Sequence, residues 1–253
     1  MVDVFEQVEE ELRSARYKRL AKTWLPVVGG VLAIALIAAL AWWGWDSWQT
    51  SRAEKASVAY SRGVEAMQTN NASGAEAAFA EAENVGNGAY KSLALMQRAG
   101  LAVTADKTTE AVALFDEAAK VTSDPLLADS AAYRAALLVM DTAPLADVQA
   151  RLEPLIEEGR PLRPFAQQAL AMAQLQHGKL AEARAGFVQL TLGQNVPDVI
   201  RQFSQGGIDA IDGGVAANLP QIIAAQKALP APAPAQGLAD GLTPSAPQAA
   251  PAQ

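Results

Sequence analysis

The chain has 253 residues, of which 51% are hydrophobic and only 6% aromatic, so that much of its apolar content is alanine. Its 20 basic and 27 acidic residues give a formal charge of −7, which excludes a basic face that neutralises nucleic-acid phosphates. Because the chain has no cysteine and one histidine, His177, a disulfide framework, a thiol nucleophile and a structural zinc site are excluded as well. Alanine-rich sequence with few β-branched runs favours an all-helical protein.

Residues 1–22 are a short charged segment before the first apolar run. Asp3 and Glu6 have the spacing of a capping box, and apolar residues recur behind them at helical intervals. The pattern predicts an amphipathic helix in a cytoplasmic tail. This helix either contacts the membrane or a partner's cytoplasmic loop, or it is solvated and only carries the charges that fix the topology.

Residues 23–45 are predicted to form a transmembrane helix. No charged residue lies between Lys22 and Asp46, and about 20 apolar helical residues are enough to cross the roughly 30 Å core of a bilayer. A buried helix of a soluble core is the alternative, but such a helix does not need indole rings at both ends, where tryptophans anchor a span at the headgroup level. The predicted membrane anchors are all the tryptophans of the chain: Trp24, Trp42, Trp43, Trp45 and Trp48.

The distribution of lysine and arginine predicts the orientation of this span. The residues that determine the topology are Arg13, Arg16, Lys18, Arg19 and Lys22. The positive-inside rule places them in the cytoplasm and residues 46–253 outside it, which in a Gram-negative cell is the periplasm. We therefore expect a single-pass protein of the bacterial inner membrane. Cleavage after Ala39-Leu40-Ala41 is the competing interpretation, but the apolar run is longer than the core of a signal peptide.

A motif recurs over residues 56–192, after a juxtamembrane linker over residues 46–55. It consists of a small or branched residue, a large apolar anchor four residues later, and a further apolar residue three positions on. The anchors follow one another at a period near 36 residues: Phe79, Phe115, Leu152 and Phe187. Sixteen residues before each anchor stands a small residue that lets two helices approach closely: Gly63, Ala99, Ala136 and Ala171.

Turn-forming residues separate the predicted helices where a series of helical hairpins needs them. Inside the repeats they are Asn70-Asn71, Ala105-Asp106, Asp141-Thr142 and His177-Gly178. Between the repeats they are Gly86-Asn87-Gly88, Ser123-Asp124-Pro125, Gly159-Arg160-Pro161 and Gly193-Gln194-Asn195. One hairpin alone cannot bury its apolar face, so we expect four stacked hairpins to share a core.

This period and the small/large pattern resemble the tetratricopeptide repeat over residues 56–192. The proline that usually follows the second helix is present only loosely, as Pro125 and Pro161. A bulky aromatic is usual at three positions that are held here by Ala59, Ala132 and Gln167. The expected fold is therefore all-α: one N-terminal transmembrane helix, a tetratricopeptide-like solenoid of about four hairpins, and a disordered C-terminal tail.

Residues 193–227 are expected to form capping helices with a more polar outer face. The first of them starts at Pro197-Asp198 and is expected to be interrupted at Gly206-Gly207 and at Gly213-Gly214. Residues 228–253 are mostly Ala, Pro and Gln with one charge, which is too little apolar surface for a folded core. We expect this tail to be a spacer, with a ligand for another domain as the alternative.

In the tetratricopeptide family, the first helix of each hairpin turns one stripe of side chains toward a concave groove. The resemblance implies a groove for an extended apolar peptide or a partner helix, and flexible methionines in the stripe would suit varied partners. The alternative is that the stripe is core, or is covered by the segment after the repeats. The predicted groove residues are Tyr60, Val64, Met67, Leu93, Met96, Val103, Tyr133, Leu137, Met140, Phe165, Met172 and Leu175.

No catalytic signature accompanies these patterns. His177 lies in a predicted turn without a fixed carboxylate or hydroxyl partner, and the glycine pairs lack the spacing of a phosphate-binding loop. Acidic pairs such as Glu157-Glu158 are typical of solvated helix faces. We therefore expect a protein that is not an enzyme and has no cofactor, no metal and no nucleic-acid partner.

The whole layout, a tail of 22 residues, one span and a degenerate four-repeat domain outside, resembles the YfgM-like ancillary subunits of the bacterial SecYEG translocon. The resemblance implies association with SecYEG and with membrane-anchored periplasmic chaperones of the prolyl-isomerase type. It also implies binding of unfolded exported polypeptides on their way from the channel to those chaperones. A scaffold for envelope assembly or cell division is the alternative, and an anchor that holds a cytoplasmic response regulator through residues 1–22 is compatible with the first function.

Overall fold

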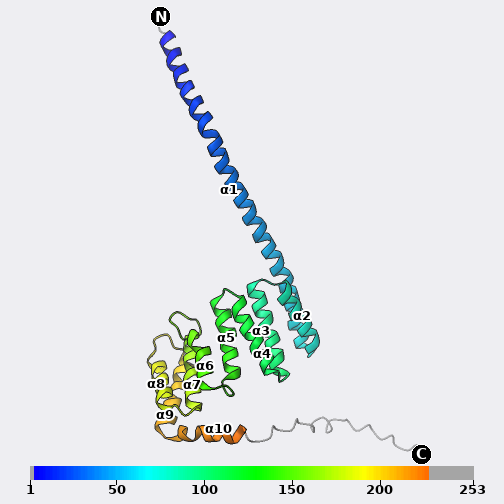
Figure 1. Ribbon diagram of the computed structural model, residues 1–253, viewed down its shortest axis with the longest axis vertical. Coiled ribbons are helices and arrows are strands. Elements are labelled where there is room, and N and C mark those ends of the chain that lie inside the picture. Colours follow the sequence, from blue (N-terminus) through cyan, green and yellow to red (C-terminus); the bar gives the residue numbers. More distant parts are fainter. Residues whose placement is uncertain (1–2, 228–253) are drawn as a thin grey trace, which may run out of the picture. The chain divides into compact units, whose positions relative to one another are not determined.

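The computed structural model describes residues 3–227, and this part of the protein is built from α-helices (Figure 1). It contains ten α-helices and two short 3₁₀ helices, and no β-strand occurs among these residues. The helices form two compact units, Met1–Val139 (unit one) and Met140–Gln253 (unit two). The predicted all-α class is confirmed, while the predicted tail over residues 228–253 lies outside the described residues.

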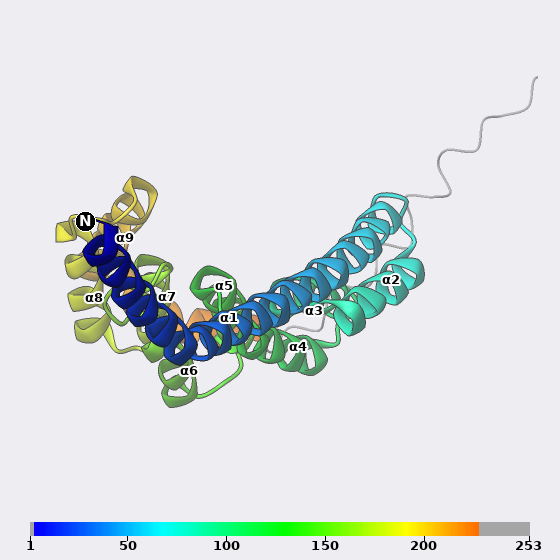
Figure 2. The ribbon, with the colours of Figure 1, turned by 90° about the horizontal axis from the view of Figure 1, so that it is seen from above.

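Unit one is a row of helices in which each packs on the next one in the chain (Figures 1 and 2). Its elements are α1 (Asp3–Gln68), α2 (Ala72–Val85), α3 (Gly88–Thr104), α4 (Thr108–Val121) and α5 (Pro125–Val139). The last part of α1 with α2, and α3 with α4, are the first two predicted hairpins. The first helices also contact one another, α1 with α3 and α3 with α5, as stacked hairpins do.

Helix α1 is one uninterrupted helix of 66 residues that joins the apolar segment to the first hairpin. The predicted span, the linker after it and the first repeat helix therefore share one backbone. By length and composition α1 is a candidate membrane span, and the large apolar side chains from Val28 to Trp48 are exposed. The five predicted tryptophan anchors are 51% to 79% exposed. The side chains of Arg13, Arg16, Lys18, Arg19 and Lys22 lie outside the described residues.

The first hairpin is closed by an aromatic anchor packed on a glycine. Phe79 of α2 is fully buried, and a Cβ atom on Gly63 of α1 would lie 2.5 Å from the Phe79 ring. Glycine is therefore the residue that allows α1 and α2 to approach over this ring. The other predicted anchors and small residues are buried as well: Phe115, Leu152, Phe187, Ala99, Ala136 and Ala171.

The turns inside the first, second and fourth hairpins repeat one hydrogen-bond pattern. In the first, the N–H of Asn71 donates to the carbonyl of Ala66 (2.8 Å) around Asn70, whose φ is 56°. This is a Schellman motif, in which a left-handed residue ends the helix and the last carbonyls find donors. Asp106 (φ 58°) and Gly178 (φ 73°) hold the same place, 36 and 108 residues after Asn70. The period found in the sequence is thus also a period of backbone geometry.

Unit two contains α6 (Leu145–Leu152), η1 (Glu153–Leu155), α7 (Arg163–Gln176), α8 (Leu180–Leu192), α9 (Asp198–Asp212), η2 (Val215–Asn218) and α10 (Leu219–Lys227). Helices α7 and α8 are the fourth predicted hairpin, and α9 packs on α8. Phe187 and Leu190 of α8 share a core with Ile200 and Ile208 of α9. The segment after the repeats is therefore helical and extends the core of the fourth hairpin.

The predicted interruption at Gly206-Gly207 is wrong, because α9 runs through both glycines. Each glycine costs about 1 kcal/mol of helix propensity, but burial of one face of α9 offsets that cost. A Cβ on Gly207 would lie 2.7 Å from the Phe187 ring, so this glycine serves close packing and not a break. The helix ends only at the following pair, where Gly214 has a φ of 75°.

Replacing Gly63 with alanine is expected to destabilise unit one by about 1–3 kcal/mol, because the added methyl group would collide with the Phe79 ring. Gly100→Ala is the matched control: it also lies inside a first helix, but nothing lies within 4 Å of the added Cβ. The control is expected to stabilise by about 0.5–1 kcal/mol. Thermal unfolding of the full-length protein in detergent, followed by circular dichroism, measures both. Tm shifts of the same sign would contradict the packing described for Gly63.

Asp106→Gly is expected to raise the free energy of unfolding by about 0.5–1 kcal/mol. Asp106 has a left-handed φ of 58°, which strains a residue with a Cβ and not a glycine. Gly178→Ala is the converse change at the equivalent turn and is expected to lower the same quantity by a similar amount. Urea unfolding of both variants provides the comparison, and a stabilising Gly178→Ala would refute the strain argument.

Candidate protein-binding surface

The predicted groove residues lie on the first helices of the hairpins or directly after them. In unit one they are Tyr60, Val64 and Met67 on α1, Leu93, Met96 and Val103 on α3, and Tyr133 and Leu137 on α5. In unit two they are Met140, Phe165, Met172 and Leu175. Because α1 contacts α3 and α3 contacts α5, equivalent residues of successive repeats in unit one are brought to neighbouring helices.

Three residues of this set are exposed apolar side chains of unit one. Met67 is 42% exposed, Val103 is 39% exposed and Leu137 is 37% exposed. Val64 on α1 and Tyr133 on α5 are half-buried. Met67 and Val103 stand 36 residues apart, one on each of two helices that touch, and Leu137 lies on α5, which also touches α3. We call Met67, Val103 and Leu137 the apolar strip.

Other members of the predicted set belong to the core. Met96 is 8% exposed and packs in one cluster with Leu95 and Phe115, and Leu175 is 6% exposed beside Phe187. Leu93 and Met172 are partly buried against the same two clusters. The predicted groove residues therefore fall into two groups. Met67, Val103 and Leu137, near the ends of the first helices of unit one, are exposed, while Met96 and Leu175 fill gaps between helices.

Tyr60 is fixed by contacts to the first two hairpins. Its hydroxyl accepts a hydrogen bond from Nε2 of Gln97 on α3 (2.7 Å). Its ring lies 5.4 Å from the Phe79 ring and 6.4 Å from the Tyr90 ring, measured between centroids. The sequence pattern identified Tyr60 but not Gln97, which has no repeated counterpart. Tyr60 therefore connects α1 to α2 and α3.

A pair of acidic residues on α2 binds Arg98 of α3. Nε of Arg98 donates to Oε1 of Glu76 (2.7 Å), and the guanidinium also bonds to Glu83. Partial burial acts to lower the pKa of Arg98, but the hydrogen bonds and charges of Glu76 and Glu83 outweigh it and raise that pKa above its ordinary value. The guanidinium therefore stays charged and connects the first hairpin to the second.

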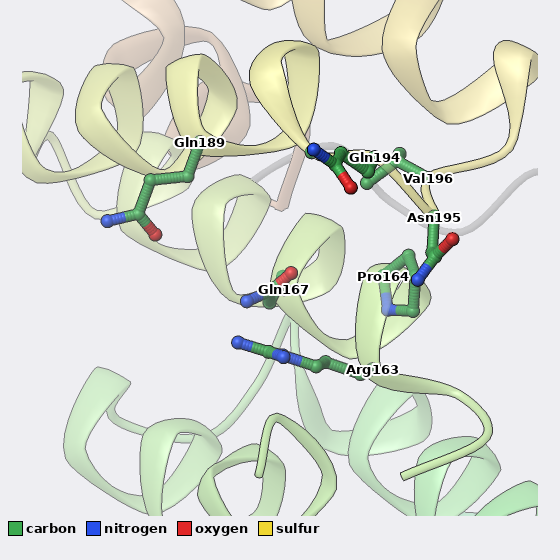
Figure 3. Close-up of a pocket in the computed structure, with 8 residues that line it drawn as sticks. Arg163, Pro164, Gln167, Gln189, Gln194, Asn195 and Val196 are labelled. Carbon is green, nitrogen blue, oxygen red and sulfur yellow. The ribbon is translucent and has the colours of Figure 1, made fainter. Parts of the chain in front are cut away.

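Unit two contains a cleft along the hairpin of α7 and α8, with amide side chains in its lining. Two adjoining cavities of about 450 and 310 Å³ share Gln167 and Gln189. Figure 3 shows Gln167 of α7 between Arg163 below it and Gln194 of the α8–α9 loop above. Gln167 stands where the repeat family usually has a bulky aromatic, so a smaller polar side chain leaves space there. The sequence identified this departure but not the cavity.

The described residues offer little for a chemical reaction. No group of three or more His, Asp or Glu side chains lies close enough to hold a metal ion in the part of the chain that the structure covers. His177 is exposed in the turn after α7. What the surface provides is an apolar strip in unit one and a cleft rich in amide side chains in unit two, which are features for recognition.

A comparison with protein families identifies the family to which this helical arrangement belongs. The chain matches the family model described as tetratricopeptide repeat-like domain over residues 18–189, which is well over half of its length. The protein belongs to this family. A tetratricopeptide repeat-like domain is typically a non-catalytic fold that binds other proteins, in agreement with the recognition features above. No curated protein and no solved structure matches the chain.

The repeat-like domain offers a titration test at Tyr133, because half-burial raises the pKa of its phenol above the ordinary value of 10.0. The folded protein keeps this phenol neutral at a pH where the unfolded chain ionises it. The contribution of this neutral phenol to the free energy of unfolding is therefore fully present below about pH 10. It is lost as the pH rises through the pKa of Tyr133 in the folded protein. Tyr133→Phe is expected to reduce this alkaline loss, measured by urea unfolding across the range. An identical loss in both proteins would show that Tyr133 is solvated.

Proposed function

We propose that this protein is a membrane-anchored adaptor that binds other proteins through the first helices of its repeats. The observation that carries the proposal is the apolar strip of Met67, Val103 and Leu137, exposed side chains on three successive first helices of a tetratricopeptide repeat-like domain. Exposed apolar side chains gathered on one face are typical of a binding surface, while scattered single ones are not. A flexible methionine in the strip suits partners of varied shape.

Anchoring in a membrane is supported by α1. Its apolar stretch is long enough to span and has tryptophans at both ends, and the large apolar side chains described between Val28 and Trp48 are all exposed. The matched family region begins at residue 18, so it includes this stretch together with the repeats. The lysines and arginines before the span favour a cytoplasmic N-terminus, which puts the repeats in the periplasm of a bacterial inner-membrane protein.

The partner class that we propose is the SecYEG translocon together with membrane-anchored periplasmic chaperones. The layout of tail, span and degenerate repeats resembles the YfgM-like subunits of that channel. Unfolded exported polypeptides expose apolar segments, and a strip of apolar side chains on a membrane-anchored domain is suited to receiving them. In this role the protein passes exported chains from the channel to chaperones.

A structural scaffold for envelope assembly or cell division is the second candidate, and the cleft of unit two favours it. That cleft is lined by Arg163 and by the amide side chains of Gln167, Gln189, Gln194 and Asn195. Directional hydrogen-bonding groups of this kind select one defined partner, whereas an apolar strip accepts many. A scaffold would bind a single folded protein and ignore unfolded chains.

The experiment that tests the proposal extracts the tagged protein from its native membrane in mild detergent and identifies the co-purifying proteins by mass spectrometry. Translocon subunits with periplasmic chaperones are the expected result. A single division or outer-membrane assembly factor in their place would overturn the adaptor function in favour of the scaffold.

The double variant Val103→Glu, Leu137→Glu is expected to weaken the capture of an unfolded apolar polypeptide by about tenfold or more, since two charges would have to be desolvated in the strip. Both side chains are exposed, so the helical content is expected to stay unchanged. Val58→Glu is the matched control, because Val58 is 62% exposed on α1 but lies off the strip. Equal affinity of all three proteins for the polypeptide, measured by fluorescence anisotropy, would locate the binding surface elsewhere.

A further inference from the structure

Arg52 connects the end of the apolar stretch of α1 to the repeats. Its guanidinium lies 4.9 Å from the ring centroid of Trp48, one turn earlier on the helix. Its Nε donates to the carbonyl of Val85 (3.1 Å) and its Nη2 to the carbonyl of Gly86 (3.2 Å). A cation at the C-terminal end of α2 is also favoured by the helix dipole. The end of α2 is therefore held at the level of Arg52.

The ends of the next helices of unit one lie at the same level. A Cβ on Gly88, the first residue of α3, would lie 2.9 Å from the carbonyl of Val121, the last residue of α4. Helix α5 begins four residues after Val121, at Pro125. We call residues 86–91 and 121–126 the proximal edge. The turns inside the hairpins lie at the opposite end, because α1 continues for 16 residues from Arg52 to Gln68, or about 24 Å.

We propose that the proximal edge lies against the lipid headgroups of the leaflet from which α1 emerges; this rests on the proposed membrane anchoring. Tryptophans settle where the hydrocarbon core meets the headgroups. The four residues from Trp48 to Arg52 rise about 6 Å along the helix. One headgroup layer is about 5–7 Å thick, since the bilayer measures about 40–45 Å around a core of about 30 Å. The edge therefore reaches the outer boundary of that layer.

The first repeat has no flexible joint that would let unit one turn away from the membrane. Between Trp45 and Gln68 α1 has no proline, and its one glycine there, Gly63, is packed on Phe79. The rings of Trp45 and Trp48, 5.6 Å apart, continue the contact that Arg52 makes. The direction of the span thus fixes the direction of the hairpins.

The side chains of the proximal edge suit a headgroup layer. Leu126 is 53% exposed at the start of α5, and Lys120 is exposed beside the edge in the last turn of α4. An apolar side chain with a neighbouring ammonium group matches the mixed chemistry of this zone. The acidic group at the edge, Asp124, is exposed and caps the start of α5, since its Oδ1 accepts hydrogen bonds from the backbone N–H groups of Leu126 and Leu127.

The test uses single cysteines, which is straightforward because the chain has none. Ser123→Cys places a fluorophore on the proximal edge, and Thr108→Cys places the same fluorophore at the start of α4, at the opposite end of the hairpin. Both positions are exposed. The full-length protein is reconstituted in phosphatidylcholine–phosphatidylglycerol vesicles in which part of the lipid carries a nitroxide on its headgroup. Quenching several-fold stronger at position 123 than at position 108 is expected, and equal quenching overturns the proposal.

Flotation of the same vesicles separates this proposal from the anchoring on which it rests. A protein that does not float with the vesicles contradicts the membrane anchor itself. A protein that floats with equal quenching at both positions contradicts only the placement of the edge. A six-residue Gly-Ser insertion between Gln49 and Thr50 is the second variant, and it is expected to keep flotation and helical content while reducing the quenching at position 123. Unchanged quenching in that variant overturns the argument from the continuous helix.

Discussion

The contact between an aromatic ring and a residue without a Cβ is the constraint on which both units depend. Two helices that enclose a phenylalanine can approach closely only if one of them presents almost no side chain to the ring. Phe79 meets Gly63 in this way in the first hairpin, and Phe187 meets Gly207 where α9 joins the fourth. The close approach of α1 to α2 and the close packing of α9 on α8 both follow from these contacts.

The repeated parts of the structure could be predicted because several independent signals coincide there. The anchors and the small residues before them share a period near 36 residues and are buried, and the turn residues of the first, second and fourth hairpins lie between helices as expected. The fate of Met96 could not be predicted, because methionine is equally suited to a groove and to a core, and only the packing of α3 against Phe115 decides. The interruption predicted at Gly206-Gly207 was wrong for a related reason. Glycine weakens an exposed helix, but in a helix packed against a ring it allows close approach.

The surface combines two kinds of recognition in one chain. Unit one presents an apolar strip whose members differ in shape, which favours contacts of low specificity. Unit two presents amide groups around Gln167, where the loss of a bulky side chain leaves a cleft. The sequence predicted the residues of the first by periodicity, while for the second it showed only the departure from the family pattern at Gln167 and not the cleft. The size of the cleft depends on the loop between α8 and α9, whose course no periodic signal reports.

Because α1 is unbroken, the number of residues between its apolar stretch and the first repeat fixes how the repeats are rotated about the helix axis. Each helical residue advances about 1.5 Å and turns about 100° around the axis. Loss or gain of one residue between Trp48 and Arg52 would barely change the height of unit one, yet it would rotate the apolar strip through more than a quarter of a circle. A change of about seven residues, close to two full turns, would nearly restore the direction. The number of residues in this segment therefore sets the direction of the apolar strip about the axis of α1. In a membrane-anchored protein, that direction decides which neighbouring proteins the strip can contact.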